Sequence, residues 1–145
     1  MIVLLRELLE ENNDNMPFIE SMKDQMVALY QQLSSCPDIP LNLFLHIVRK
    51  ELVFVDVNEQ NEIRGAFTLL LEQKVLRKGG MVAHIEDVVV SEKYRNQHIG
   101  KKLIEHAIMV SREYKCYKVI LNCNDGVQGF LSLIHISEPT RPAII

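Results

Sequence analysis

The segment His84–Val90, H-I-E-D-V-V-V, and the turn Tyr94–Lys101, Y-R-N-Q-H-I-G-K, decide how this chain folds. The first is an apolar, β-branched run typical of a strand, yet it carries two adjacent carboxylates, Glu86 and Asp87. Neighbouring residues of a regular strand point to opposite faces of the sheet. Both carboxylates can therefore reach one ligand only if the strand bulges or splays at this point.

A helix and a second strand follow the turn. Apolar residues recur at helical spacing from Ile99 through Leu103, Ala107 and Val110, and Lys118–Leu121 reads as a buried strand. A helix that joins two strands of one sheet forms a βαβ unit, in which the strands run parallel.

The residues upstream predict two helices and a hairpin. Apolar positions from Phe18 to Leu33 form one helical stripe, and a shorter stripe runs from Leu41 to Val48. The runs Leu52–Val57 and Ala66–Leu71 flank turn residues and predict an antiparallel pair, whereas Ile2–Leu9 fits either a strand or a helical turn. We therefore expect an α/β (α+β) domain with a mixed, mostly antiparallel sheet, a central βαβ unit and two N-terminal helices.

Composition excludes several classes of function. The 145 residues are 48% hydrophobic and 24% charged, as in an ordinary globular domain, and the net charge is -3. The chain has no net positive charge that would attract a nucleic acid, so any recognition of phosphate has to come from a local group of residues. The apolar opening is too short for a membrane span.

Cysteine and histidine spacing argues against disulfides and metals. Cys36, Cys116 and Cys123 are odd in number and form no C-x-x-C pair, which favours a reducing, cytoplasmic location. The five histidines show no metal-ligand spacing with them, so we expect no metal.

The turn at Tyr94–Lys101 could hold a phosphate. Backbone N–H groups at a helix start, with Lys101 and Lys102 beside them, suit an anion such as pyrophosphate. The alternative is a basic helix start whose glycine only packs on the sheet. Neither a P-loop nor a G-x-G-x-x-G motif is present, so the sequence gives little support to binding of ATP or a dinucleotide.

These segments resemble a known family. The strand and turn are similar to motif A of the GNAT acetyltransferases, Q/R-x-x-G-x-G/A. With Cys116–Cys123, C-Y-K-V-I-L-N-C, they closely resemble the glucosamine 6-phosphate N-acetyltransferases. The resemblance implies the GNAT fold, acetyl-CoA as cosubstrate and direct attack by the sugar amine in a ternary complex. It also implies a place in UDP-N-acetylglucosamine synthesis.

The resemblance implies a cofactor site along the strand and the turn. Two residues depart from the pattern, because Asn96 stands where the family has Gly and His98 stands at the first Gly of the superfamily motif. Asn tolerates positive φ, so the first departure is mild. The implied acetyl-CoA contacts are Val88, Val89, Val90, Arg95, Asn96, Gln97, His98, Ile99, Gly100 and Lys101.

The resemblance also implies a site for the amino sugar. Lys74 and Arg77 would bind the sugar phosphate, and Glu86 and Asp87 would position the amine. Val88 would contact the substrate and supply a backbone donor to the oxyanion. Tyr117 and Lys118 would reach into the site of a dimer mate, which implies a homodimer with shared active sites.

Each of these residues can also be interpreted as having only a structural role. Carboxylates in an edge strand prevent aggregation, surface cations near a turn are usually solvated, and Tyr117 could be a packing residue.

The end of the chain departs from the family. Val127 stands at a cofactor-binding Asn, Leu131 stands at the Tyr that protonates the leaving thiolate, and Leu cannot donate a proton. We expect a GNAT domain over 1–130 that lacks its final strand. Residues 131–145 read as a tail foreign to the family and typical of a translated sequencing adapter.

Two alternatives to the transferase function stay open. Loss of the Tyr favours a truncated acyl-CoA-binding or dimerisation module without turnover. A GNAT enzyme that acetylates another amine is the third possibility.

Overall fold

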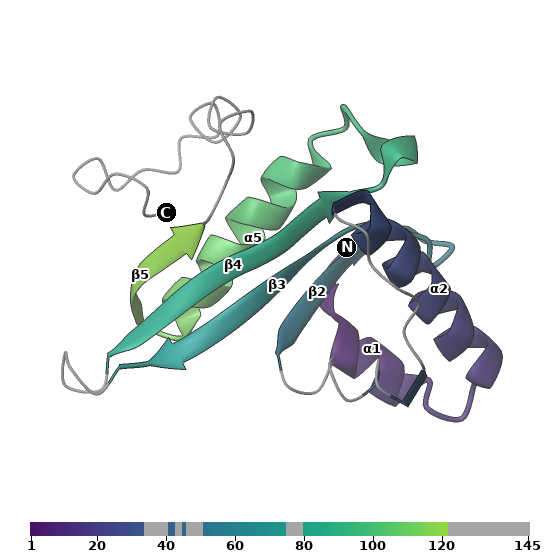
Figure 1. Ribbon diagram of the computed structural model, residues 1–145, viewed down its shortest axis with the longest axis horizontal. Helices are drawn as coiled ribbons and strands as arrows, with labels where there is room; N and C mark the ends of the chain where they lie inside the picture. The colour runs from purple at the N-terminus through teal and green to yellow at the C-terminus, as the bar shows by residue number, and fades with distance from the viewer. Residues whose placement is uncertain (34–40, 43–44, 46–50, 75–79, 122–145) are drawn as a thin grey trace.

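The chain folds around a five-stranded sheet with helices on both faces (Figure 1). The computed structural model describes residues 1–33, 41–42, 45, 51–74 and 80–121. Along the sheet the strands follow the order β1-β2-β3-β4-β5. The elements are β1 (Ile2–Leu4), α1 (Leu5–Glu11), α2 (Met16–Leu33), β2 (Leu52–Val57), β3 (Ile63–Gln73), β4 (Met81–Val90), the 3-10 turn η1 (Glu92–Tyr94), α5 (Ile99–Glu113) and β5 (Cys116–Leu121).

The N-terminal segment uses both conformations that its sequence allows, because β1 runs directly into α1. The expected stripe on the next helix is confirmed, with Met22, Met26 and Leu29 buried in α2. Asn15 caps this helix, since its side chain accepts a hydrogen bond from the Phe18 N–H at 3.1 Å. Of the second predicted helix, 41, 42 and 45 are helical and the rest lies outside the described residues.

Alternation along β2 divides the core into two layers. Val53, Val55 and Val57 pack with α1 and α2 on one face. Phe54 packs on the other face, with residues of α5. Figure 1 shows α5 behind the sheet and α1 and α2 in front of one end of it.

The predicted hairpin and βαβ unit are both confirmed. β2 and β3 pair antiparallel, and so do β3 and β4, whereas β4 and β5 pair parallel. The prediction that Lys118–Leu121 is buried was too strong, because only Leu121 is buried there. In the part of the sheet that the structure describes, β5 is the last strand and contacts a neighbour on one side.

A buried carboxylate ties the strands to the start of α5. Asp56 in β2 is fully buried and accepts a hydrogen bond from Arg64 Nη2 at 3.1 Å. Lys102 Nζ on α5 lies 4.0 Å from the same Asp56 oxygen. A buried charge is stable only when it is paired, so these cations neutralise Asp56 and link α5 to the hairpin.

Gly65 lets the first turns of α5 approach β3 closely. A Cβ at this position would lie 2.9 Å from Leu103 Cδ1 and 2.9 Å from the Val89 carbonyl oxygen. It would also lie 3.2 Å from Ile99 Cγ2. A larger residue would therefore push the N-terminal end of α5 away from β3 and β4.

We predict that Gly65→Ala destabilises the fold by about 1–3 kcal/mol, the usual cost of overpacking. Urea unfolding of the wild type and the variant measures this difference. An unchanged midpoint with an unchanged slope would show that α5 does not need the close approach.

His106 on α5 packs against two phenylalanines of the sheet. Its ring lies 5.4 Å from the Phe54 ring and 6.4 Å from the Phe67 ring, centroid to centroid. Burial lowers the pKa of His106 below its usual 6.5, although Glu113 opposes this effect. The folded state therefore favours neutral His106.

Because the folded-state pKa is lowered, the stabilisation from neutral His106 is fully present above about pH 6.5. It is lost as the pH falls through the folded-state pKa. We predict that His106→Leu reduces the loss of unfolding free energy between pH 7.5 and pH 5. Urea unfolding at both pH values tests this, and equal losses in the two proteins would refute it.

Candidate functional site

β4 contains one extra residue at the carboxylate pair. Ala66 pairs with Val89 and Thr68 pairs with Glu86, so three steps along β4 match two steps along β3. Asp87 has φ 53, a left-handed conformation that Asp adopts more readily than most residues. The bulge expected from the sequence is confirmed, and it lies at Asp87 and Val88.

The bulge changes which side chains share a face of β4. Ile85 and Val88 both pack on the α5 side of the sheet, although they are three positions apart, which in a regular strand would put them on opposite faces. Val90 packs on that side too, whereas Val89 is buried against the α1 and α2 side. The apolar alternation thus restarts out of phase after Asp87, whose side chain is exposed.

Backbone groups at the bulge take no part in the described pairing of β4 with β3 and β5. Neither Asp87 nor Val88 has a register partner on β3. The described pairing of β4 with β5 ends at Ile85 and Leu121. A bulged residue is left unpaired by the ladder, so its backbone N–H and C=O groups can serve a ligand.

The turn after β4 brings several N–H groups to the start of α5. Asn96 has φ 63 and His98 has φ 59, so both departures from the family pattern adopt a conformation typical of Gly. The His98 side chain makes no capping hydrogen bond to α5. The N–H groups of the first helical turn, which lack intrahelical acceptors, are therefore available to an anion.

The bulged strand β4 is followed along the chain by the turn and α5, and Gly65 leaves room for the end of β4 and the start of α5 to lie close together. The Cβ position of Gly65 is within 3.2 Å of both Val89 and Ile99, which belong to the strand and to the helix start. Ile99 is buried, while the side chains of 95 to 98 are exposed. Gly65 therefore brings the end of β4 close to the start of α5, so the predicted cofactor residues of the strand and of the turn lie near one another.

The residues predicted for the sugar phosphate lie elsewhere on the sheet. Lys74 pairs with Glu72, which raises the pKa of Lys74, and nearby Tyr117 adds to that effect. Lys118 Nζ lies 5.9 Å from the Tyr117 ring centroid. Lys74, Tyr117 and Lys118 are thus neighbours, and Arg77 lies outside the described residues.

This cation group and the carboxylate pair are far apart within one chain. Gln73, Met81 and Cys116 are register partners at the beginning of β4. Glu86 is five residues further along β4, which at roughly 3.3 Å per residue is about 17 Å. One chain alone does not place Lys74 beside Glu86 and Asp87.

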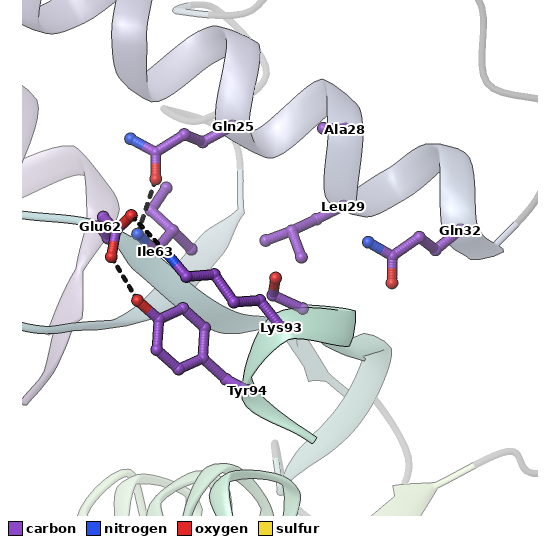
Figure 2. A pocket seen from close by; sticks show the side chains of 9 residues that line it. Gln25, Ala28, Leu29, Gln32, Glu62, Ile63, Lys93 and Tyr94 are labelled. Atoms are coloured by element: carbon purple, nitrogen blue, oxygen red, sulfur yellow. Dashed lines mark hydrogen bonds and ion pairs between the residues drawn. The ribbon is translucent and has the colours of Figure 1, made fainter.

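Two polar clusters had no signal in the sequence. Glu72 holds Lys74 and also His84, whose Nε2 lies 2.8 Å from Glu72 Oε2, and both contacts lower the pKa of Glu72. The second cluster joins Glu62 to Lys93 and Tyr94 across some thirty residues of sequence. It borders a pocket of about 170 Å³ between α2 and η1 (Figure 2).

Among the described residues, no three His, Cys, Asp or Glu side chains gather closely enough to ligate a metal ion. No helix in the described ranges is long and apolar enough to cross a membrane.

Comparisons with known proteins agree on one family. The family model described as Acetyltransferase (GNAT) matches residues 5–133. The chain is 33% identical to a probable glucosamine 6-phosphate N-acetyltransferase 2 of Oryza sativa subsp. japonica, over 72% of this chain and 69% of that protein. It is also 33% identical to glucosamine 6-phosphate N-acetyltransferase 1 of Dictyostelium discoideum, over 72% of this chain and 60% of the relative. The chain thus spans about two thirds of these relatives.

A solved structure gives the same result. The crystal structure of glucosamine-6-phosphate N-acetyltransferase from Arabidopsis thaliana superposes with a TM-score of 0.73 at 26% sequence identity. The superposition covers 85% of this chain and 89% of that one.

The left-handed turn residues generate a stability prediction. Asn96→Gly should leave stability within about 0.5 kcal/mol of the wild type, because Gly adopts φ 63 without strain. Asn96→Val should cost about 1–2 kcal/mol, because a β-branched residue is strained there. Thermal or urea unfolding compares the two variants, and equal stabilities would contradict the assigned turn conformation.

Proposed function

The chain belongs to the Acetyltransferase (GNAT) family, and on that premise we propose that it acetylates the amine of glucosamine 6-phosphate. Acetyl-CoA would be the acetyl donor and N-acetylglucosamine 6-phosphate the product. The bulge at Asp87, on the strand that leads through η1 to the 95–101 turn with its free N–H groups, is the observation that carries the proposal. The names of the rice and Dictyostelium relatives support the choice of sugar.

The described residues fit acetyl-CoA. Positive φ at Asn96 and His98, the uncapped start of α5 and Lys101 suit a pyrophosphate. Val88 and Val90 are partly buried on the α5 side of β4. In the proposal this end of the strand flanks the pantetheine arm. The bound cosubstrate supplies an activated acetyl thioester.

The acceptor side of the reaction uses the carboxylates. Glu86 and Asp87 would accept hydrogen bonds from the sugar amine and orient its lone pair toward the acyl carbon. The Val88 N–H, outside the described ladders, would donate to the carbonyl oxygen as negative charge develops there. Most of the rate enhancement would come from this positioning and from the oriented N–H.

The proton balance requires little from the protein. An amine that titrates near 7.7–8.0 is partly neutral at pH 7 and can attack directly. The nitrogen forms its bond to carbon as the carbon–sulfur bond breaks, and the proton that it loses restores the thiol by way of solvent. Leu131 stands where the family has the Tyr that protonates the leaving thiolate, and leucine cannot donate a proton. We therefore expect turnover about 10²- to 10⁴-fold below that of a relative with Tyr.

We further propose a homodimer with shared active sites. The separation of Lys74 from Glu86 along one sheet supports it, because a second copy could bring the phosphate-binding cations to the carboxylates. Lys74, Arg77, Tyr117 and Lys118 would then bind the sugar phosphate across the dimer. A role in UDP-N-acetylglucosamine synthesis and a cytoplasmic location complete the proposal, the latter supported by the cysteine pattern.

We predict that Lys74→Met raises the KM for glucosamine 6-phosphate about tenfold, because a charged hydrogen bond to phosphate is lost. The KM for acetyl-CoA should stay within about twofold of the wild-type value. Thiol release, measured at varied sugar concentration, gives both constants.

Glucosamine without phosphate is the matched control for this variant. Lys74→Met should leave kcat/KM for glucosamine within about twofold of the wild-type value. An equal loss for both sugars would contradict the assignment of Lys74. A wild-type chain that releases no thiol with glucosamine 6-phosphate would contradict the proposed function.

A further inference from the structure

A polar cluster ties the β2–β3 turn to η1, directly before the N–H-rich turn. Glu62 in the β2–β3 turn accepts hydrogen bonds from the Tyr94 hydroxyl and, at 3.0 Å, from Lys93 Nζ. Asn58 Nδ2 donates to Glu62 Oε2 at 3.0 Å and lies 3.2 Å from the Tyr94 hydroxyl. Figure 2 shows Glu62, Lys93 and Tyr94 converging at one side of the pocket.

Glu62 holds these donors as a carboxylate. The hydrogen bond from Tyr94, followed by those from Lys93 and Asn58, lowers the pKa of Glu62 to about 2. The group is therefore ionised at neutral pH and acts only as an acceptor. Hydrogen bonds to a charged acceptor are stronger than neutral ones.

The β2–β3 turn that carries Glu62 is itself well ordered by local contacts. The Asn58 side-chain oxygen accepts hydrogen bonds from the N–H groups of Gln60 at 3.0 Å and Glu62 at 2.9 Å. Gln25 on α2 accepts a hydrogen bond from the Ile63 N–H at 2.7 Å. These contacts order the backbone around Glu62, whose carboxylate then holds the Tyr94 hydroxyl.

The cofactor turn is positioned by its two ends and by Arg95, whose Nη2 donates a hydrogen bond to Gln32 Oε1 on α2 at 3.4 Å. Tyr94 precedes Arg95, and buried Ile99 begins α5. The side chains of Asn96, Gln97 and His98 are exposed between these ends. A displacement of Tyr94 would therefore move the N–H groups of the turn, whereas the bulge at Asp87 is held separately by the pairing of its flanking residues, Glu86 and Val89, with β3.

We propose that Glu62 is a positioning residue for acetyl-CoA, because it holds Tyr94 and thereby orients the 95–101 turn toward the pyrophosphate. The inference rests on the proposed function. It gives Glu62 a role in binding the distant, non-reacting part of the donor and no role in the acyl-transfer step.

Glu62→Gln and Tyr94→Phe test this inference, with Glu59→Gln as the matched control. Glu59 is an exposed carboxylate in the same β2–β3 turn, so its variant makes the same charge change without touching Tyr94. We expect each test variant to raise the KM for acetyl-CoA about 3- to 10-fold, with kcat within about twofold. Glu59→Gln should match the wild type.

S-acetylpantetheine, an acetyl donor without pyrophosphate, separates positioning from general damage. The kcat/KM for this donor should change less than about twofold in both variants. The double variant should lose no more than the larger single loss, because both residues act through one interaction. Tyr94→Phe keeps the ring and still tests the inference if Glu62→Gln does not fold.

Two results would overturn the inference. Unchanged KM values for acetyl-CoA in both variants would show that the turn does not need the Glu62 contact. Equal losses with acetyl-CoA and S-acetylpantetheine would show a general structural defect. Failure of the proposed function has a different outcome, since the wild type itself would then release no thiol with glucosamine 6-phosphate. Calorimetry with CoA would still measure whether the two variants weaken binding of the donor.

Discussion

The extra residue at Asp87 in β4 is the constraint on which the candidate site depends. Without it, the alternation of β4 would continue in phase, and Val88 would lie on the opposite face from Ile85. With it, Val88 and Val90 face the α5 side, and the backbone at 87 and 88 leaves the described ladder. One extra residue therefore both turns these valines toward the α5 side and leaves backbone groups for polar contacts.

The close approach of α5 to the sheet completes this arrangement. Gly65 has no side chain to separate Ile99 and Leu103 from β3, and buried Asp56 draws Lys102 toward β2. Packing and charge thus fix the helix start beside the bulge. The turn between them is polar and exposed, so its conformation depends on left-handed residues and on contacts at its ends.

The sequence predicts the elements that have a regular period. The stripe of α2 and the apolar runs of the hairpin locate helices and strands, because burial of one face requires such spacing. A bulge or a splay at the carboxylate pair could also be predicted, on the condition that both side chains reach one ligand, because neighbouring residues of a regular strand point to opposite faces. The Glu62 and Tyr94 contact could not, because it joins two irregular turns that only the folded sheet brings together. The distance between Lys74 and Glu86 likewise follows from strand register, which hydrophobic pattern alone does not set.

An NMR titration of the ¹⁵N-labelled chain with acetyl-CoA tests most directly whether the bulge and the turn form one donor site. The account predicts that the largest amide shifts fall on Val88 and on 96–101, with smaller shifts on Asn58 and Glu62. Shifts confined to other parts of the sheet, or no shifts at millimolar acetyl-CoA, would contradict it.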